Sequence, residues 1–498
     1  MLRRPSSGDL RIIGHFTGRI FLAFAGVSVL PLMVAIGLGE WAPVSSFVLM
    51  MGVFAVVGAG LRRLLATSRP LDLRHGMVVV ALVWLLVPAV AAIPLALSGH
   101  FSDFLDAYFD AVSGLTTTGL SVLQDLDHLA LSLNLWRHLL QFLGGLGIVV
   151  VAVWLSVGGA GLALAHSEGR ADKILPSVSS TSRFIWRVSL VHMAVGVAVL
   201  YGVGVVFLGF TSGRSVFHSL MIFFAAFSTG GFSVQSTSLG YYHSAILEAA
   251  ASVMMIAGAM SFQLHFALWQ RRYRDALRNL ETRAYLTTFV VLLGVTMVGL
   301  GALGTYDGIL GHARQGVFQF LSAHTTTGFS TIPSSELALW TGLAFVGIAA
   351  AMALGGMAAS TAGGVKALRV GLTAKVLKGE SKRVMMPPGA VIPVGYFQDG
   401  HRRMTVEVAH AAMFITVLYL GLYLVGTGVG IAYGYPLQDA LFESVSAGAT
   451  VGLSAGITDP AMPVVLQIVY MCEMWLGRLE FVAVFALIGT VWSSIRGR

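Results

Sequence analysis

Long apolar runs alternate with short polar stretches along this chain. A helix needs about 20 apolar residues to cross a bilayer, and the first two runs, 16–39 and 43–61, reach that length before a basic turn. After them the same unit recurs four times, as a spanning helix, a short apolar segment, a polar loop and a second spanning helix. We expect these units at 75–158, 184–268, 284–371 and 404–493.

Each unit contains an apolar segment that is too short to cross about 30 Å of hydrocarbon as a helix. Non-helical backbone at membrane depth is tolerated only where protein covers it or where it lines water, so we expect each segment to enter as a half-helix and turn back. The C-terminal ends of these half-helices would direct partial negative charge toward a common axis, which favours a cation. The segments are 102–115, 213–227, 311–324 and 437–448.

The polar loop after each short segment is nearly the same in all four units, and we call these segments the Thr-Gly loops. Aligned on a glycine, each copy has Thr two residues before it and Ser two residues after it. A single copy would indicate a surface turn, but four loops on one axis would form rings of backbone carbonyls that replace the hydration shell of a cation. Glycine is required where such a backbone takes conformations that a Cβ forbids. The predicted filter residues are Thr116, Thr117, Thr118, Gly119, Ser228, Thr229, Gly230, Gly231, Thr325, Thr326, Thr327, Gly328, Ala449, Thr450, Val451 and Gly452.

The sequence therefore predicts an all-α polytopic membrane protein. Four pseudo-symmetric helix–pore-helix–helix repeats would surround one pore, as in potassium channels, with two extra N-terminal transmembrane helices. The predicted boundaries are 1–74 for the N-terminal helices and 75–165, 166–269, 270–380 and 381–498 for the repeats.

Composition and charge support a membrane protein. The chain is 56% hydrophobic and 11% charged, whereas soluble domains carry about 25% charged residues. The net charge of +8 does not indicate nucleic-acid binding, because Lys and Arg gather in alternate loops, which is the positive-inside pattern. We expect contact with membrane lipid and none with nucleic acid, both termini in the cytoplasm, and a first apolar run that is retained rather than cleaved as a signal peptide.

A glycine-rich stretch, residues 354–366, interrupts the last helix of the third unit. Each Gly costs about 1 kcal/mol inside a helix relative to Ala, so the stretch should unwind or hinge it. Its place on the cytoplasmic side of the Thr-Gly loops favours a gate, and the alternative is a seam of small residues at which helices pack. The predicted gate residues are Gly355, Gly356, Ser360, Thr361, Gly363, Gly364 and Arg478.

Arg478 lies midway along the last predicted spanning helix. A charge at that depth costs about 2.5–3.5 kcal/mol on insertion scales and usually faces a water-filled path or a partner. In the pore it would raise a barrier to cations. The alternatives are an ion pair with Glu480 or Glu473, or a contact with the stretch 354–366.

Other charged residues are weaker candidates. Asp110 and Glu443 each precede a loop glycine by nine residues, and they would draw cations to the pore mouth, bond the loop backbone, or cap a helix. Three further basic residues lie near predicted external helix starts, where we expect them at the membrane interface. They are Arg137, Arg214 and Arg314.

The remaining chemistry is sparse. His324 adjoins the third Thr-Gly loop, but no metal-binding spacing such as HExxH accompanies it, and neither GxGxxG after a strand nor a Walker-type loop occurs. We therefore expect no organic cofactor in this chain. The one cysteine, Cys472, lies in an apolar stretch and is expected to pack as a small hydrophobe.

With these motifs in place, the chain resembles the Trk/Ktr/HKT superfamily of potassium transporters, and the two extra N-terminal helices resemble its TrkH branch. The resemblance implies potassium uptake across a bacterial inner membrane, a homodimer with one pore per subunit, and a cytoplasmic ring of TrkA-type nucleotide-binding regulatory subunits. It also implies that 355–364 is the gating loop, that Arg478 is the pore arginine, and that the four loop glycines bind potassium, the transported ion. Sodium-preferring plant relatives carry Ser at the first glycine, so Gly119 implies potassium. Ser228, Gly230 and Met357 are departures from the family pattern.

Two alternatives remain at this stage. A Ktr-type, sodium-stimulated transporter would share the loops but lack the two N-terminal helices. An intramembrane serine hydrolase would use a Gly-x-Ser motif, but it needs one nucleophile with a positioned histidine, and this chain has four equivalent serines. The sequence leaves open whether uptake is passive or proton-coupled, and whether the basic loop 366–403 docks the regulatory subunit or anionic lipid.

Overall fold

The computed structural model describes residues 6–123, 125–147, 178–306, 308–387, 394–398 and 400–496. It is helical apart from one antiparallel hairpin of β1 (Gly395–Phe397) and β2 (His401–Arg403), which the sequence did not predict. The end of the second helix expected in the first unit, the link that follows it, and Pro388-Gly389 of the basic loop lie outside the described residues.

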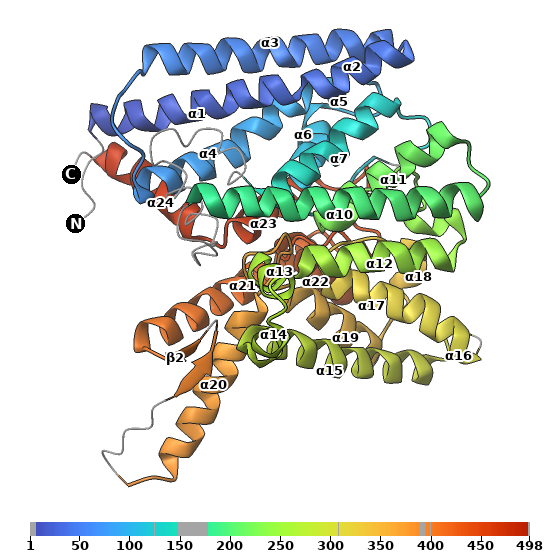
Figure 1. Ribbon diagram of the computed structural model, residues 1–498, viewed down its shortest axis with the longest axis vertical. Helices are drawn as coiled ribbons and strands as arrows, with labels where there is room; N and C mark the ends of the chain where they lie inside the picture. The colour runs from blue at the N-terminus through green and yellow to red at the C-terminus, as the bar shows by residue number, and fades with distance from the viewer. Residues whose placement is uncertain are drawn as a thin grey trace.

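The two predicted N-terminal helices form a separate layer along one side of the molecule (Figure 1). They are α1 (Ser7–Val27) with its continuation α2 (Val29–Leu38), and α3 (Trp41–Leu64). A capping box of Ser6 and Asp9 starts α1. At Gly18 and Gly58 an added Cβ would lie under 3.0 Å from backbone of the other helix, so these small residues allow α1 and α3 to cross closely.

Four helix–pore-helix–helix units follow, as the sequence predicts. All four pore helices end at the expected residue and three begin within two residues of the expected start, whereas the third begins six residues late, at Val317. The first unit contains α4 (Leu73–Ala91), α5 (Ile93–Ala96), the pore helix α6 (Phe104–Leu115) and α7 (Leu131–Leu146). The second contains α10 (Val178–Val206), the pore helix α11 (Ser212–Phe227), η1 (Ser238–Tyr242), α12 (Ala245–Ala259), α13 (Phe262–Trp269) and α14 (Tyr273–Arg278).

The last two units have the same order. The third contains α15 (Leu280–Leu303), α16 (Gly308–Gly311), the π-helical turn η2 (His312–Gly316), the pore helix α17 (Val317–His324), α18 (Ser334–Leu337), α19 (Gly342–Ala353) and α20 (Ala367–Val384). The fourth contains α21 (Val406–Ala432), the pore helix α22 (Leu437–Gly448), α23 (Val464–Arg478) and α24 (Val482–Arg496).

The second helices of the second and fourth units are broken, and this differs from the expectation of continuous spans there. Within the described ranges, six helices are long and apolar enough to cross a membrane, or eight if each bent pair is one span. The pair α12–α13 bends by 102° and the pair α23–α24 by 111°. Arg478 therefore ends a helix at a bend and does not lie midway along one.

Burial follows the expected membrane arrangement. The four pore helices lie inside the bundle, where most of their residues are buried. The outer helices α15 and α21 expose large apolar side chains, such as Val290 (67% exposed) and Val417 (64%). Exposed apolar surface of this extent suits contact with lipid rather than water. It leaves the protected interior to the pore helices and the loops at their ends.

Candidate ion-conduction site

All four pore helices end in the same backbone turn. In α6, Thr118 N donates to Ser113 O at 2.9 Å and Thr117 N donates to Gly114 O at 3.1 Å, which is the bond pair of a Schellman motif. The other three pore helices repeat this pair. The left-handed position usually holds Gly, yet here it is always threonine, an arrangement that costs about 1–3 kcal/mol per residue. These residues are Thr117 (φ 56°), Thr229 (51°), Thr326 (53°) and Thr450 (52°).

The four loop glycines form a closed cycle. Each has a positive φ between 72° and 94°, and an added Cβ would lie under 3.0 Å from a backbone carbonyl oxygen of the next repeat. Gly119 meets the Gly230 carbonyl, Gly231 that of Thr327, Gly328 that of Val451, and Gly452 that of Thr118. The last contact returns to the first repeat, so the four loops surround one axis, although the first and last of their glycines lie more than 300 residues apart in the sequence. The structure thus brings the four predicted loops together.

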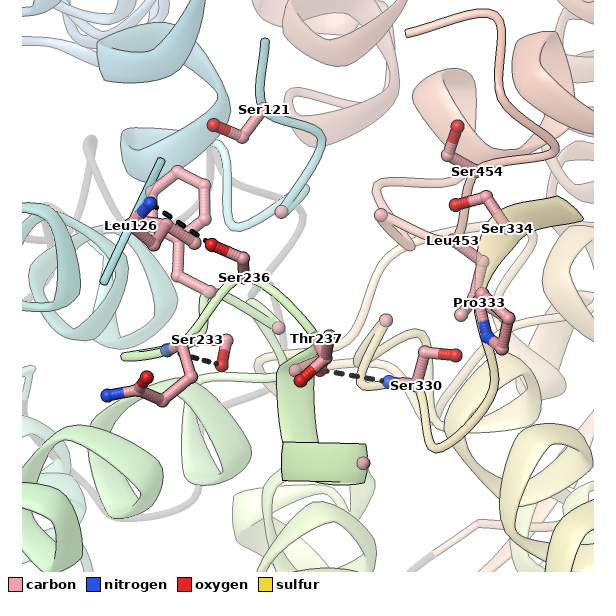
Figure 2. Close-up of a pocket in the computed structure, with 18 of the residues that line it drawn as sticks. Ser121, Leu126, Ser233, Ser236, Thr237, Ser330, Pro333, Ser334, Leu453 and Ser454 are labelled. Carbon is pink, nitrogen blue, oxygen red and sulfur yellow. Dashed lines mark hydrogen bonds between the residues drawn. The ribbon is translucent and has the colours of Figure 1, made fainter. Parts of the chain in front are cut away.

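A cavity of about 590 Å³ adjoins this cycle, and all four glycines line it. Figure 2 shows Ser121, Ser233, Ser330 and Ser454 around it, each on a segment of a different colour. These are the serines that follow the glycines in the four copies. The lining therefore includes one such serine from every repeat, among apolar side chains such as Leu123 and Ile332.

Polar side chains on three pore helices brace the segments that follow the glycines. Ser121 donates to Asp110 Oδ1 at 2.6 Å, and Ser454 donates to Glu443. Glu443 also accepts from the backbone N–H groups of Ala455, Ile457 and Thr458. Of the roles considered for Asp110 and Glu443, the contacts support bonding of the loop. Both carboxylates are fully buried.

Gln319 is the third brace, and the sequence analysis missed it. Its Nε2 donates to Ser330 Oγ at 2.9 Å and its Oε1 accepts from Thr331 N at 3.1 Å. Gln319 precedes Gly328 by the same nine residues that separate Asp110 from Gly119. The nine-residue spacing would have identified Gln319 if amide side chains had been considered together with carboxylates.

Arg137 is not interfacial, and that prediction is wrong. It is 1% exposed and forms a bidentate pair with Asp110 at 2.7 and 2.8 Å. Its guanidinium also lies 4.1 Å from the centre of the Phe232 ring, which belongs to the second repeat. Arg314 pairs with the buried Glu248, whereas Arg214 is bonded to Tyr241 at the surface.

The stretch 354–366 is a loop, as predicted, because α19 ends at Ala353 and α20 begins at Ala367. It lies against the Thr-Gly loops. Thr361 Oγ1 lies 3.0 Å from Phe227 O and 2.8 Å from Gly258 O, and Thr229 Oγ1 donates to it at 3.2 Å.

A second contact of this loop reaches the third repeat, where Gly363 N donates to Thr326 Oγ1 at 2.8 Å. Added side chains are excluded nearby, because a Cβ on Gly363 would lie under 3.0 Å from the carbonyl oxygen of Ala449. Gly355 packs against Gly363, Gly356 against Ala362, Ser360 donates to Met357 O, and Gly364 has φ 67°. The predicted gate residues between Gly355 and Gly364 thus form one compact loop against the Thr-Gly loops.

Arg478 contacts this loop directly. Its Nη1 donates to Thr361 O at 2.8 Å, and its Nη2 donates to Gly144 O at the end of α7. Among the alternatives considered for Arg478, the contact with the loop is confirmed. Glu480 pairs with Arg369 at the start of α20. A small cavity of about 20 Å³ is lined both by residues of the loop, such as Ser360 and Gly363, and by Arg478.

Two further residues singled out in the sequence are His324 and Cys472. His324 packs against Tyr285, Phe289 and Phe320, and the described residues include no group of three or more metal-ligating side chains. Cys472 is exposed on α23 and is not packed inside, so that expectation is wrong.

Comparisons with known proteins agree with this geometry. Residues 45–489 match the family model TrkH, described as a cation transport protein. The chain is 29% identical to an uncharacterized cation transporter of Methanocaldococcus jannaschii, over 98% of this chain and 97% of that one. It is 31% identical to the Trk system potassium uptake protein TrkH of Halomonas elongata, over 96% and 98%. The crystal structure of the potassium transporter TrkH from Vibrio parahaemolyticus matches with a TM-score of 0.81 at 25% identity, over 96% of this chain and 98% of that one.

Proposed function

This chain belongs to the TrkH family of cation transport proteins, and from that premise we propose that it takes up potassium across a bacterial inner membrane through a four-loop selectivity filter. The observation that carries the proposal is the closed cycle in which each loop glycine faces a carbonyl oxygen of the next repeat. A cycle of that kind surrounds one ion path with backbone oxygens from all four repeats.

The filter would select by replacing water around the ion. Successive residues of each loop contribute four levels of carbonyl oxygens, which substitute for the hydration shell of potassium or rubidium. The pore helices add the negative ends of their dipoles at the same axis. Potassium is here the transported substrate, and its coordination would come from the backbone of the predicted filter residues.

The loop 354–366 would act as the gate of this path. Support comes from its bonds to two of the four equivalent threonines, Thr229 through Thr361 and Thr326 through Gly363 N. A segment that bonds the base of the filter from one side obstructs the path until those bonds break. Opening would therefore require the loop to leave the second and third repeats.

Arg478 would hold the gate closed in two ways. Its hydrogen bonds link the gate loop to the end of α7. Its positive charge below the filter raises the energy of a cation in the path, since charges interact strongly where water is scarce. The two effects act in the same direction.

Regulation would come from the cytoplasmic side. We include in the proposal a homodimer, a TrkA-type nucleotide-binding subunit, and both termini in the cytoplasm. The relatives named as Trk system proteins support a regulatory partner, and α20 and the hairpin, which extend beyond the bundle, offer a surface for it (Figure 1). Since α20 follows the gate loop directly, a partner bound there would pull on the gate.

Rubidium uptake into proteoliposomes tests the proposal. Purified wild type and Gly119→Ser are compared with and without competing sodium. We expect wild type to take up rubidium selectively and Gly119→Ser to lose selectivity toward sodium. If the intact protein takes up no rubidium, a variant lacking part of 355–364 is assayed next. Absence of rubidium flux in that variant as well would contradict the proposal that the four loops form a pore.

A further inference from the structure

The second filter loop differs from the other three, because it lacks the side chains that brace them. The position nine residues before the glycine is Asp110, Gln319 or Glu443 in the other repeats, but Ile222 in the second. The position six before the glycine is Ser113 or Ser446 in the outer repeats, where each hydroxyl accepts from the glycine N–H at 3.0 Å. In the second repeat that position is Ala225.

A polar stripe on α7 of the first repeat takes over this role. Asn134 Nδ2 donates to Val234 O at 3.3 Å, and His138 Nε2 lies 3.1 Å from Phe232 O. Gln141 Nε2 donates to Gly230 O, while its Oε1 accepts from Phe232 N at 3.2 Å. All three side chains are buried, with at most 1% exposed.

The spacing of the two segments explains the fit. The stripe advances three or four residues along the helix for every two residues along the loop. A helix rises about 1.5 Å per residue and extended backbone about 3.3 Å, so the two steps have similar lengths of about 5–6.6 Å. The next step of the same pairing places Gly145 of the helix beside Ser228 of the loop. There the two backbones approach so closely that a Cβ on Gly145 would lie under 3.0 Å from Ser228.

Gln141 also occupies the place of a missing side chain. The other loops carry Thr118, Thr327 or Val451 immediately before the glycine, and the second carries Gly230. A Cβ on Gly230 would lie under 3.0 Å from the Gln141 amide. The absence of a side chain in the loop and the presence of the glutamine beside it are therefore complementary.

We propose that Gln141 is a specificity-determining positioning residue that fixes the second filter loop from the neighbouring repeat. The inference rests on the proposed filter function. By donating to the Gly230 carbonyl, which faces Gly119 in the cycle, Gln141 sets the position of one oxygen in the ring. Among the described contacts, this bond is the only side-chain restraint on the Gly230 carbonyl. Without it the second loop can move toward the axis, and the ring of carbonyl oxygens can contract to a size that suits sodium.

The test compares rubidium and sodium uptake by proteoliposomes of wild type, Gln141→Leu and Gln467→Leu. Gln467 is the matched control, because it is a buried glutamine whose Nε2 bonds Asp106 at 2.8 Å, away from the loops. We expect the rubidium-to-sodium ratio to fall about tenfold in Gln141→Leu, the factor that corresponds to 1.4 kcal/mol, the order of one hydrogen bond. Gln467→Leu should keep the wild-type ratio.

A double variant tests the complementarity and protects against a folding defect. In Gln141→Ala with Gly230→Thr, the threonine restores to the loop the side chain found in the first and third repeats, and we expect selectivity to recover at least in part. An unchanged rubidium-to-sodium ratio in folded Gln141→Leu would overturn the role of Gln141 and leave the filter proposal standing. The same loss of selectivity in Gln467→Leu would have the same meaning. A wild type without preference for rubidium would overturn the filter itself and this role with it.

Discussion

The Arg478 guanidinium donates a hydrogen bond of 2.8 Å to the carbonyl oxygen of Thr361, at the centre of the proposed gate loop 354–366. Because the same side chain also bonds Gly144 O on α7, it connects the gate to a helix of the first repeat. Hydrogen bonds from a charged group contribute about 1.5–3 kcal/mol each. We expect Arg478→Ala to raise cation flux by about tenfold or more, measured as rubidium uptake by proteoliposomes.

Arg478→Lys separates the two effects of this residue. A lysine keeps the positive charge, but its compact ammonium lacks the rigid fork that reaches two carbonyls at once. Flux that stays low in the lysine variant would attribute closure to charge, and flux that rises as in the alanine variant would attribute it to the link between Thr361 and Gly144. Unchanged flux in well-folded Arg478→Ala would contradict both.

Thr361 gives a second test of the gate. Its hydroxyl is within hydrogen-bond distance of Phe227 O, Gly258 O and Thr229 Oγ1. Thr361→Val keeps the shape but removes these bonds, each about 1 kcal/mol, so we expect a several-fold higher flux. Thr361→Ser retains the hydroxyl and should behave like wild type. If both variants leak equally, the small-residue packing of the loop and not the hydroxyl controls closure.

The buried pair of Arg137 and Asp110 should dominate the stability of the first repeat. Removing one partner of a buried ion pair leaves an uncompensated charge and costs about 3–5 kcal/mol. We therefore expect Asp110→Asn to lower the thermal unfolding temperature in detergent markedly. Asp275→Asn, which breaks the half-exposed pair with Arg272, should cost no more than about 1 kcal/mol. Similar shifts for the two variants would refute the importance of the buried pair.

Much of the fold was predictable because length and local chemistry determine it. Segments too short to cross the bilayer became the pore helices, and the recurring glycines marked positions of positive φ, whereas the positive φ of the threonines two residues earlier was not predicted. The bends at Met260 and at Glu480 were not predictable. Neither bend point is a proline or glycine, and Glu480 has φ 50°, so packing in the folded bundle determines where these helices break.

The site was predictable to a similar depth. The loop residues follow from a repeated motif, whereas their supports depend on which helices pack together. Arg137 finds Asp110 27 residues away, and Gln141 reaches Gly230 89 residues away. No local pattern identifies such partners. A single sequence therefore gives the proposed filter residues more readily than the groups that hold them.

The glycine cycle itself makes the sharpest prediction. Gly452 combines a φ of 93° with a close approach to the Thr118 carbonyl, whereas Gly434 has a φ of 90° and nothing within 4 Å of an added Cβ. Alanine at either position incurs the strain of a left-handed conformation, but only Gly452→Ala also displaces a filter carbonyl. We expect Gly452→Ala to abolish rubidium selectivity and Gly434→Ala to lower only stability, by about 1 kcal/mol. Equal selectivity in the two variants would mean that conformational strain alone, and not the ring of carbonyls, requires glycine at this position.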